Sequence, residues 1–100
     1  EVYMLTINDI SNGVLRAVQS FPVKRVSLFG SYADGQQNEE SDVDLLVEFI
    51  TTGVSLFLIS DLKQQLEDEL AIAVDLIHAP LLEDDLISIG KVVDIYEAQG

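Results

Sequence analysis

The spacing of apolar residues in this 100-residue chain predicts two amphipathic helices before any chemistry is considered. Apolar positions recur at helical spacing over residues 8–20, where Asn8 or Ser11 is available as a cap and Phe21-Pro22 ends the element. A second helix is expected over residues 54–70. Its apolar side chains share one face, opposite a polar face: Leu58, Ile59, Leu62, Leu66 and Leu70.

Three short runs rich in β-branched and other apolar residues predict strands. They lie at residues 23–29, 42–48 and 71–77. The second run is apolar beyond its opening carboxylates, which is typical of a strand in the centre of a sheet. The third is stopped by Pro80.

A final helix is expected over residues 83–97, with three acidic residues at its positive end. Helices that alternate with such short strands predict an α/β (α+β) fold, a sandwich around a small sheet of about three strands. The apolar face of this last helix is wider than a core stripe needs, so part of it is expected to face a partner in a homo- or hetero-oligomer. That face consists of Leu86, Ile87, Ile89, Val92, Val93 and Ile95.

Length and charge limit the function classes. One hundred residues, 48% of them apolar, fit a single domain over residues 1–100. No apolar run is long enough to span a bilayer and no signal peptide is evident, so a cytoplasmic protein without a membrane partner is expected. The net charge of −13 repels a phosphate backbone, which argues against duplex nucleic acid and favours a basic protein partner.

The candidate functional residues lie just after the first predicted strand and at the start of the second. Gly30 lets the backbone turn sharply beside a ligand, and Ser31 offers an amide and a hydroxyl to a phosphate at a helix start. Asp42 and Asp44 are two residues apart on a strand, so their carboxylates leave the same face about 6.5 Å apart. Such a pair suits hard cations such as Mg²⁺ that also bind phosphate oxygens.

Asp75 is a third candidate because it interrupts an apolar strand, where an unpaired charge is costly. On a strand beside residues 42–48 it would complete the metal site and accept a proton from an acceptor hydroxyl. Taken singly, each feature has an ordinary explanation: a common Gly-Ser turn, turn chemistry at Asp42 and Asp44, and a solvent-facing strand residue at Asp75. His78 is more simply a polar surface residue than a general base.

Gly30-Ser31, ten intervening residues and Asp42-Val43-Asp44 resemble the signature of the nucleotidyltransferases of the DNA polymerase beta superfamily. The likeness extends over nearly the whole chain and is greatest to the stand-alone minimal nucleotidyltransferases, called MNT or MntA-like. It implies a polymerase-beta-type fold with a mixed sheet flanked by helices. It also implies two Mg²⁺ ions held by Asp42, Asp44 and Asp75, and ATP positioned by Gly30 and Ser31.

The same resemblance implies a partner. Members of this group are paired with a helical HEPN-family ribonuclease in toxin–antitoxin modules of a type VII-like kind, and they quench that toxin by transferring AMP to a tyrosine hydroxyl. One departure stands out: Asp34 occupies the place of an arginine common in the family. It puts a negative charge where the family has a positive one near the expected nucleotide site, which bears on either the affinity for triphosphate or the contact with the partner.

The sequence is also compatible with two other functions. A weakly catalytic or non-catalytic antitoxin would neutralise its partner by binding alone, which fits Asp34 and the scarcity of basic residues. Transfer to a small molecule or to tRNA is less favoured, because the sequence shows neither an acceptor pocket nor a basic groove.

Overall fold

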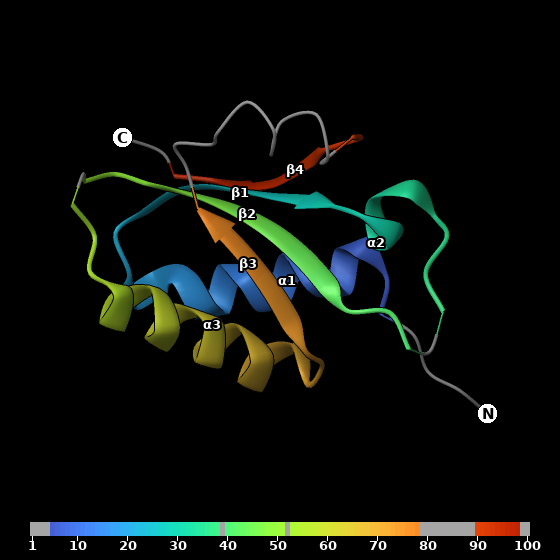
Figure 1. Cartoon of the computed structure of the whole chain (residues 1–100), viewed down its shortest axis with the longest axis horizontal. Helices are drawn as coiled ribbons and strands as arrows, with labels where there is room; N and C mark the ends of the chain where they lie inside the picture. The colour runs from blue at the N-terminus through green and yellow to red at the C-terminus, as the bar shows by residue number, and fades with distance from the viewer. Residues whose placement is uncertain (1–4, 39, 52, 79–89, 99–100) are drawn as a thin grey trace.

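The computed structural model describes residues 5–38, 40–51, 53–78 and 90–98, and up to residue 78 its elements follow the predicted order (Figure 1). Within these residues no helix is both long and apolar enough to cross a membrane. The elements are α1 (Ile7–Ala17) with the 3-10 turn η1 (Val18–Ser20), β1 (Val23–Phe29), α2 (Ser31–Asp34), β2 (Val43–Phe49), α3 (Leu56–Leu70), β3 (Val74–His78) and β4 (Val93–Glu97).

The strands form one mixed sheet in the order β3-β2-β1-β4. β1 runs antiparallel to β2 on one side and to β4 on the other, whereas β3 lies parallel to β2 at the far edge. The predicted mixed sheet flanked by helices is confirmed. The sheet has four described strands instead of about three.

The additional strand corrects the predicted final helix over residues 83–97. Residues 83–89 of that prediction lie outside the described residues, and the segment Val93–Glu97 is β4. Two consecutive valines and an isoleucine favour extended backbone, and Gly90, with φ +70°, has a backbone conformation that an α-helix does not use. Val93 and Ile95 pack against the hydrophobic core from the sheet, so the apolar residues assigned to a helix face here belong to a strand.

Several boundaries also differ from the sequence prediction. The second strand is Val43–Phe49 instead of 42–48, so Asp42 precedes the strand and does not belong to it. Thr6, instead of Asn8 or Ser11, caps α1: its hydroxyl accepts a hydrogen bond from the Asp9 amide, and the Asp9 carboxylate accepts one from the Thr6 amide. This reciprocal capping box satisfies two amides that the helix itself leaves unpaired. The third strand begins at Val74 instead of residue 71, because α3 continues to Leu70 and residues 71–73 form the turn.

The hydrophobic core lies between one face of the sheet and the helices α1 and α3, which pack side by side on that face (Figure 1). Alternate residues of β2 point into it, and Val43, Leu45 and Val47 are completely buried. The residues between them, including Asp44, point to the opposite face of the sheet. This alternation separates the core from the face on which the candidate chemistry lies.

Leu66 provides a test of this core. It is fully buried on α3, so Leu66→Ala should lower the free energy of unfolding by about 2–5 kcal/mol through lost burial and a residual cavity. Leu56→Ala is the matched control on the same helix, because Leu56 is 79% exposed; its effect should stay within about 0.5 kcal/mol. Urea unfolding of both variants measures the difference. Equal losses would contradict this assignment of the core.

Candidate functional site

The predicted Gly-Ser turn joins the end of β1 to the short helix α2. Gly30 has φ +75° and ψ −154°, a conformation that is essentially restricted to glycine. The Gly30 carbonyl accepts hydrogen bonds from the amides of Ala33 and Asp34, each at 3.1 Å, so Ser31 begins the helix as predicted. A Cβ atom at Gly30 would overlap the carboxylate of Asp44. The absent side chain therefore lets the turn lie directly against that carboxylate.

The structure places the three predicted aspartates on neighbouring strand ends. Asp42 immediately precedes β2, Asp44 is its second residue, and Asp75 is the second residue of β3. In the parallel pairing of the two strands, Asp44 and Asp75 are direct register partners. Asp75 therefore lies on the strand beside Asp44, the placement on which its expected role depends, although the two are 31 residues apart (75 − 44).

The charges of these aspartates act on one another. Partial burial of the Asp44 carboxyl is the main reason that its pKa is raised, and the negative charges of Asp75 and Asp42 raise that pKa further. Asp42 and Asp75 are themselves solvent-exposed. Among the described residues, no lysine or arginine forms an ion pair with any of the three. The site therefore has unbalanced negative charge, which a bound cation would offset.

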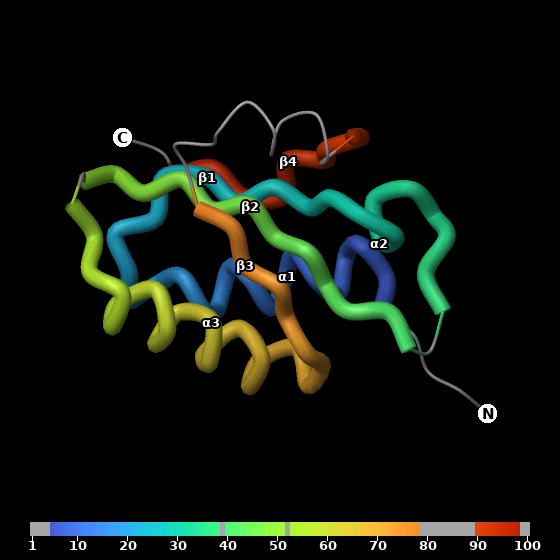
Figure 2. Tube along the Cα trace, viewed as in Figure 1, coloured from blue at the N-terminus to red at the C-terminus, as the bar shows by residue number. Residues whose placement is uncertain are grey.

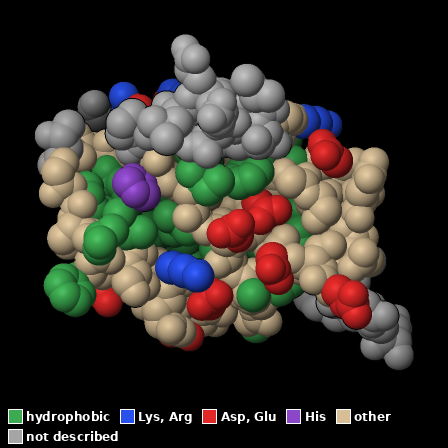
Figure 3. Space-filling model, in the orientation of Figure 1, with side chains coloured by type: hydrophobic (Ala, Val, Ile, Leu, Met, Phe, Trp, Pro, Cys, Tyr) green, Lys and Arg blue, Asp and Glu red, His purple; other side chains and the backbone are tan. Residues whose placement is uncertain are grey.

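The donor set fits a hard cation: it consists of carboxylate oxygens, which Mg²⁺ prefers, on a face open to solvent. In the described parts of the chain, no three His, Cys, Asp or Glu side chains already converge as ready-made ligands. Side-chain rotation would therefore have to bring the carboxylates of Asp42, Asp44 and Asp75 onto an ion. Figure 3 shows acidic side chains gathered near the middle of the face that carries β2 and β3.

Tyr32, Asp34 and His78 lie on the elements that carry this centre. Tyr32 follows the turn on α2 and is almost fully buried, and this burial, followed by the charge of Asp42, raises the pKa of its hydroxyl. Asp34 is the exposed last residue of the same helix. His78 is exposed at the opposite end of β3 from Asp75.

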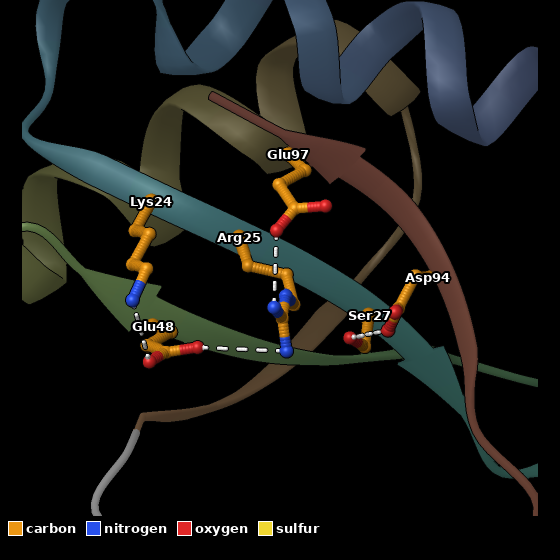
Figure 4. A network of polar contacts seen from close by, with 6 residues as sticks. All are labelled: Lys24, Arg25, Ser27, Glu48, Asp94 and Glu97. Atoms are coloured by element: carbon orange, nitrogen blue, oxygen red, sulfur yellow. Dashed lines mark hydrogen bonds and ion pairs between the residues drawn. The ribbon is translucent and has the colours of Figure 1, made fainter. Parts of the chain in front are cut away.

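A polar network that the sequence did not predict lies farther along the same face (Figure 4). The hydroxyl of Ser27, which is only 3% exposed, donates a 2.6 Å hydrogen bond to Asp94 of β4. Arg25 donates to Glu97 at 3.0 Å, which is the main cause of the raised pKa of its guanidinium, and also pairs with Glu48. The alternation of side chains along β1 could have predicted that Arg25 and Ser27 lie on this face. Their partners Glu97 and Asp94 could not be predicted, because residues 93–97 were assigned to a helix.

This network lines a hollow of about 180 Å³. Leu46 contributes to it and lies two residues after Asp44, on the same side of β2. Pockets that enclose small molecules usually measure about 300–1,000 Å³, so this hollow is too small to surround a complete nucleotide. Its lining residues are Arg25, Ser27, Leu46, Glu48, Val92 and Asp94.

Known proteins that are similar to this chain are nucleotidyltransferases. Residues 10–96 match the sequence model of the family described as "Nucleotidyltransferase domain". A Methanocaldococcus jannaschii protein named "Putative protein adenylyltransferase" is 41% identical over 96 residues, covering 91% of this chain and 99% of its own length. The "Protein adenylyltransferase MntA" of Thermococcus cleftensis is 38% identical over 88 residues, covering 83% of this chain and 87% of that protein.

Two solved structures have the same fold. A crystal structure described as a toxin–antitoxin with AMP-PNP has a TM-score of 0.73 at 24% identity, covering 89% of this chain and 74% of that one. A complex of tri-AMPylated Shewanella oneidensis HEPN toxin with MNT antitoxin has a TM-score of 0.68 at 18% identity, covering 93% and 74%. The match to the family over residues 10–96, together with the Gly-Ser turn beside the β2 carboxylates, shows that this chain belongs to the nucleotidyltransferase domain family.

Proposed function

We propose that this nucleotidyltransferase transfers AMP from Mg-ATP to a tyrosine hydroxyl of a HEPN-family ribonuclease toxin and thereby acts as its antitoxin. The observation that supports this most is the alignment of Asp44 with Asp75 on adjacent parallel strands, next to the Gly30-Ser31 turn. The turn proposed to bind phosphate lies against Asp44, and Asp44 pairs with Asp75, which supports a shared site for phosphate and metal. Relatives named as protein adenylyltransferases support a protein acceptor.

Each group has a distinct task in this proposal. The amides at the start of α2 and the hydroxyl of Ser31 would bind phosphate oxygens, and Asp42, Asp44 and Asp75 would hold the metal ions. Bound Mg²⁺ supplies electrostatic stabilisation of the charge that develops on the phosphates. The acceptor oxygen forms a bond to the α-phosphorus, the bond from that phosphorus to the bridging oxygen breaks, and pyrophosphate leaves. Asp75 accepts the proton of the acceptor hydroxyl.

The charge of the chain supports a protein acceptor of opposite sign. With 18 acidic and 5 basic residues, the net charge of −13 favours encounter with a basic surface. This chain shares its fold with a chain of the solved complex between an MNT antitoxin and a HEPN toxin. That likeness supports a HEPN-family toxin as the protein partner.

The direct test is incubation of the purified chain with Mg²⁺, ATP and its helical toxin partner, followed by intact mass measurement of both proteins. The partner is expected to gain one or more AMP masses, and peptide mapping should place them on tyrosine. EDTA and Asp42→Asn should each abolish the gain. A partner that binds tightly but stays unmodified under these conditions would refute AMP transfer.

A second function, neutralisation by binding alone, is favoured by one observation: Asp34 places an exposed negative charge on the last residue of α2, beside the proposed phosphate site. The two functions differ in one assay. If Asp42→Asn, with a normal fold, still blocks the toxin's ribonuclease activity in an equimolar complex, occlusion suffices. If inhibition is lost while the complex persists, modification is required.

The charge at Asp34 leads to a separate prediction. Asp34→Arg should lower the KM for ATP about twofold to fivefold at low ionic strength, because one exposed charge contributes up to about 1 kcal/mol. The effect should diminish as salt screens the charge. Asp61→Arg makes the same charge change on the exposed face of α3 and serves as the control. Equal KM changes in both variants would attribute the effect to net charge instead of to position.

A further inference from the structure

The turn between α3 and β3 leads directly to Asp75. Glu67 accepts two of the hydrogen bonds that hold this turn. Residues 71–73 connect the end of α3 to the start of β3 (Figure 2). Ala71 ends the helix with φ +56°, in the left-handed region that non-glycine residues seldom adopt. So tight a reversal needs contacts that hold it in place.

Glu67 contacts both sides of this reversal. Its backbone carbonyl accepts a 2.8 Å hydrogen bond from the Ala71 amide, which ends the helix. Its side-chain Oε2 accepts a 3.0 Å hydrogen bond from the amide of Val74, the first residue of β3. This second bond is partly buried, and its acceptor is a carboxylate, so it belongs to the stronger class of hydrogen bonds.

A third hydrogen bond connects the same turn to β2. The amide of Val43 donates to the Ala73 carbonyl at 3.1 Å. Val43 lies between Asp42 and Asp44, so the turn is tied to β2 at the residue that separates the two aspartates. Ala73 and Val74 are consecutive, and one is held by β2 while the other is held by Glu67.

Register matters here because side chains alternate along a strand. β3 is a five-residue strand, and among the described strands it lies at the edge of the sheet with β2 as its one neighbour. A shift of one residue relative to β2 would turn Asp75 from the face that carries Asp44 to the face covered by α1 and α3. A short edge strand has few ladder hydrogen bonds of its own with which to resist that shift.

We propose that Glu67 is a positioning residue for Asp75: its carboxylate fixes the first residue of β3 and so keeps Asp75 beside Asp44. This inference rests on the proposed function only for the role of Asp75 in AMP transfer. The contacts of Glu67 with the turn stand independently of that role.

The test compares Glu67→Ala, which removes the acceptor, with Glu67→Gln, which keeps an acceptor oxygen at the same length. Glu69→Ala is the matched control, because Glu69 also makes a tertiary contact from α3, a 2.8 Å ion pair with Arg16, at a site away from β3. Three experiments are performed: hydrogen exchange of the Val74 and Val43 amides, Mg²⁺ binding by calorimetry, and steady-state kinetics of AMP transfer to the partner, which give kcat and KM.

Glu67→Ala should speed exchange of the Val74 amide about tenfold or more, as expected for one lost charge-assisted hydrogen bond. It should weaken Mg²⁺ binding and lower kcat about tenfold, with KM for ATP changed less than twofold because Gly30 and Ser31 are untouched. Glu67→Gln should recover most of each quantity. Glu69→Ala should leave Val74 exchange and kcat unchanged.

The inference would be overturned if Glu67→Ala kept the wild-type exchange rate of the Val74 amide and the wild-type kcat. It would also be overturned if Glu69→Ala changed both quantities as much as Glu67→Ala does. If the wild-type chain transfers no AMP at all, the proposed function fails. The exchange and Mg²⁺ measurements then still decide whether Glu67 holds β3 in register.

Discussion

Asp44→Asn is expected to lower the rate of AMP transfer by about two to three orders of magnitude or more while making the metal-free protein more stable. The loss of activity follows from removing a metal-binding charge at the centre of the three aspartates. The gain in stability has a separate cause: partial burial and the charges of Asp75 and Asp42 raise the pKa of Asp44 in the folded protein. Asparagine has a similar shape and avoids the cost of holding a charge there.

The pH dependence of this gain follows from the sign of the shift. Because the folded-state pKa of Asp44 lies above its unfolded value, ionised Asp44 destabilises the fold at pH values above the folded pKa. The penalty fades as the pH falls through that pKa and is absent below the unfolded value. The stability advantage of Asp44→Asn over wild type should therefore be largest near neutral pH and shrink on acidification.

Thermal unfolding with and without Mg²⁺ measures both effects. Mg²⁺ should raise the melting temperature of wild type, because a ligand that binds only the folded state stabilises it, and should have little effect on Asp44→Asn. Asp61→Asn, an exposed substitution on α3, should change neither activity nor the response to Mg²⁺. An Asp44→Asn variant that modifies the partner at the wild-type rate would remove Asp44 from the proposed site.

Gly30→Ala is expected to reduce activity by about 100-fold or more and to lower the free energy of unfolding by about 1–3 kcal/mol. Two costs add at this position. The backbone at φ +75° and ψ −154° is strained for any residue with a side chain, and the new methyl group would overlap the Asp44 carboxylate. Relief requires the turn and Asp44 to move apart, which separates the phosphate-binding amides from the proposed metal site.

Gly35→Ala separates these two costs. Gly35 has the same φ of +75°, but a Cβ atom there meets nothing within 4 Å. It should therefore lose about 1 kcal/mol of stability from backbone strain and retain most of the activity. Urea unfolding and AMP-transfer rates of both variants provide the comparison. Parallel losses of activity would indicate that backbone strain, not the contact with Asp44, accounts for the effect of Gly30→Ala.

Much of the architecture could be predicted from local patterns, because those patterns report which side chains must be buried. Helical spacing identified α1 and α3, and β-branched runs identified β1 and β2. The Gly30-Ser31 turn was predictable for a similar reason: few residues except glycine permit that backbone. The error at residues 93–97 arose because a short apolar run suits either a helix or a strand.

The sequence by itself determined the helix and strand order through residue 78 and the glycine turn, since each depends on residues close together in the chain. Only the tertiary structure decided that Asp75 lies beside Asp44, that residues 93–97 pair with β1, and that Ser27 contacts Asp94, 67 residues away. These contacts depend on strand register and on an available sheet edge. Both are set by hydrogen bonds between distant segments, such as the one from the Val43 amide to the Ala73 carbonyl.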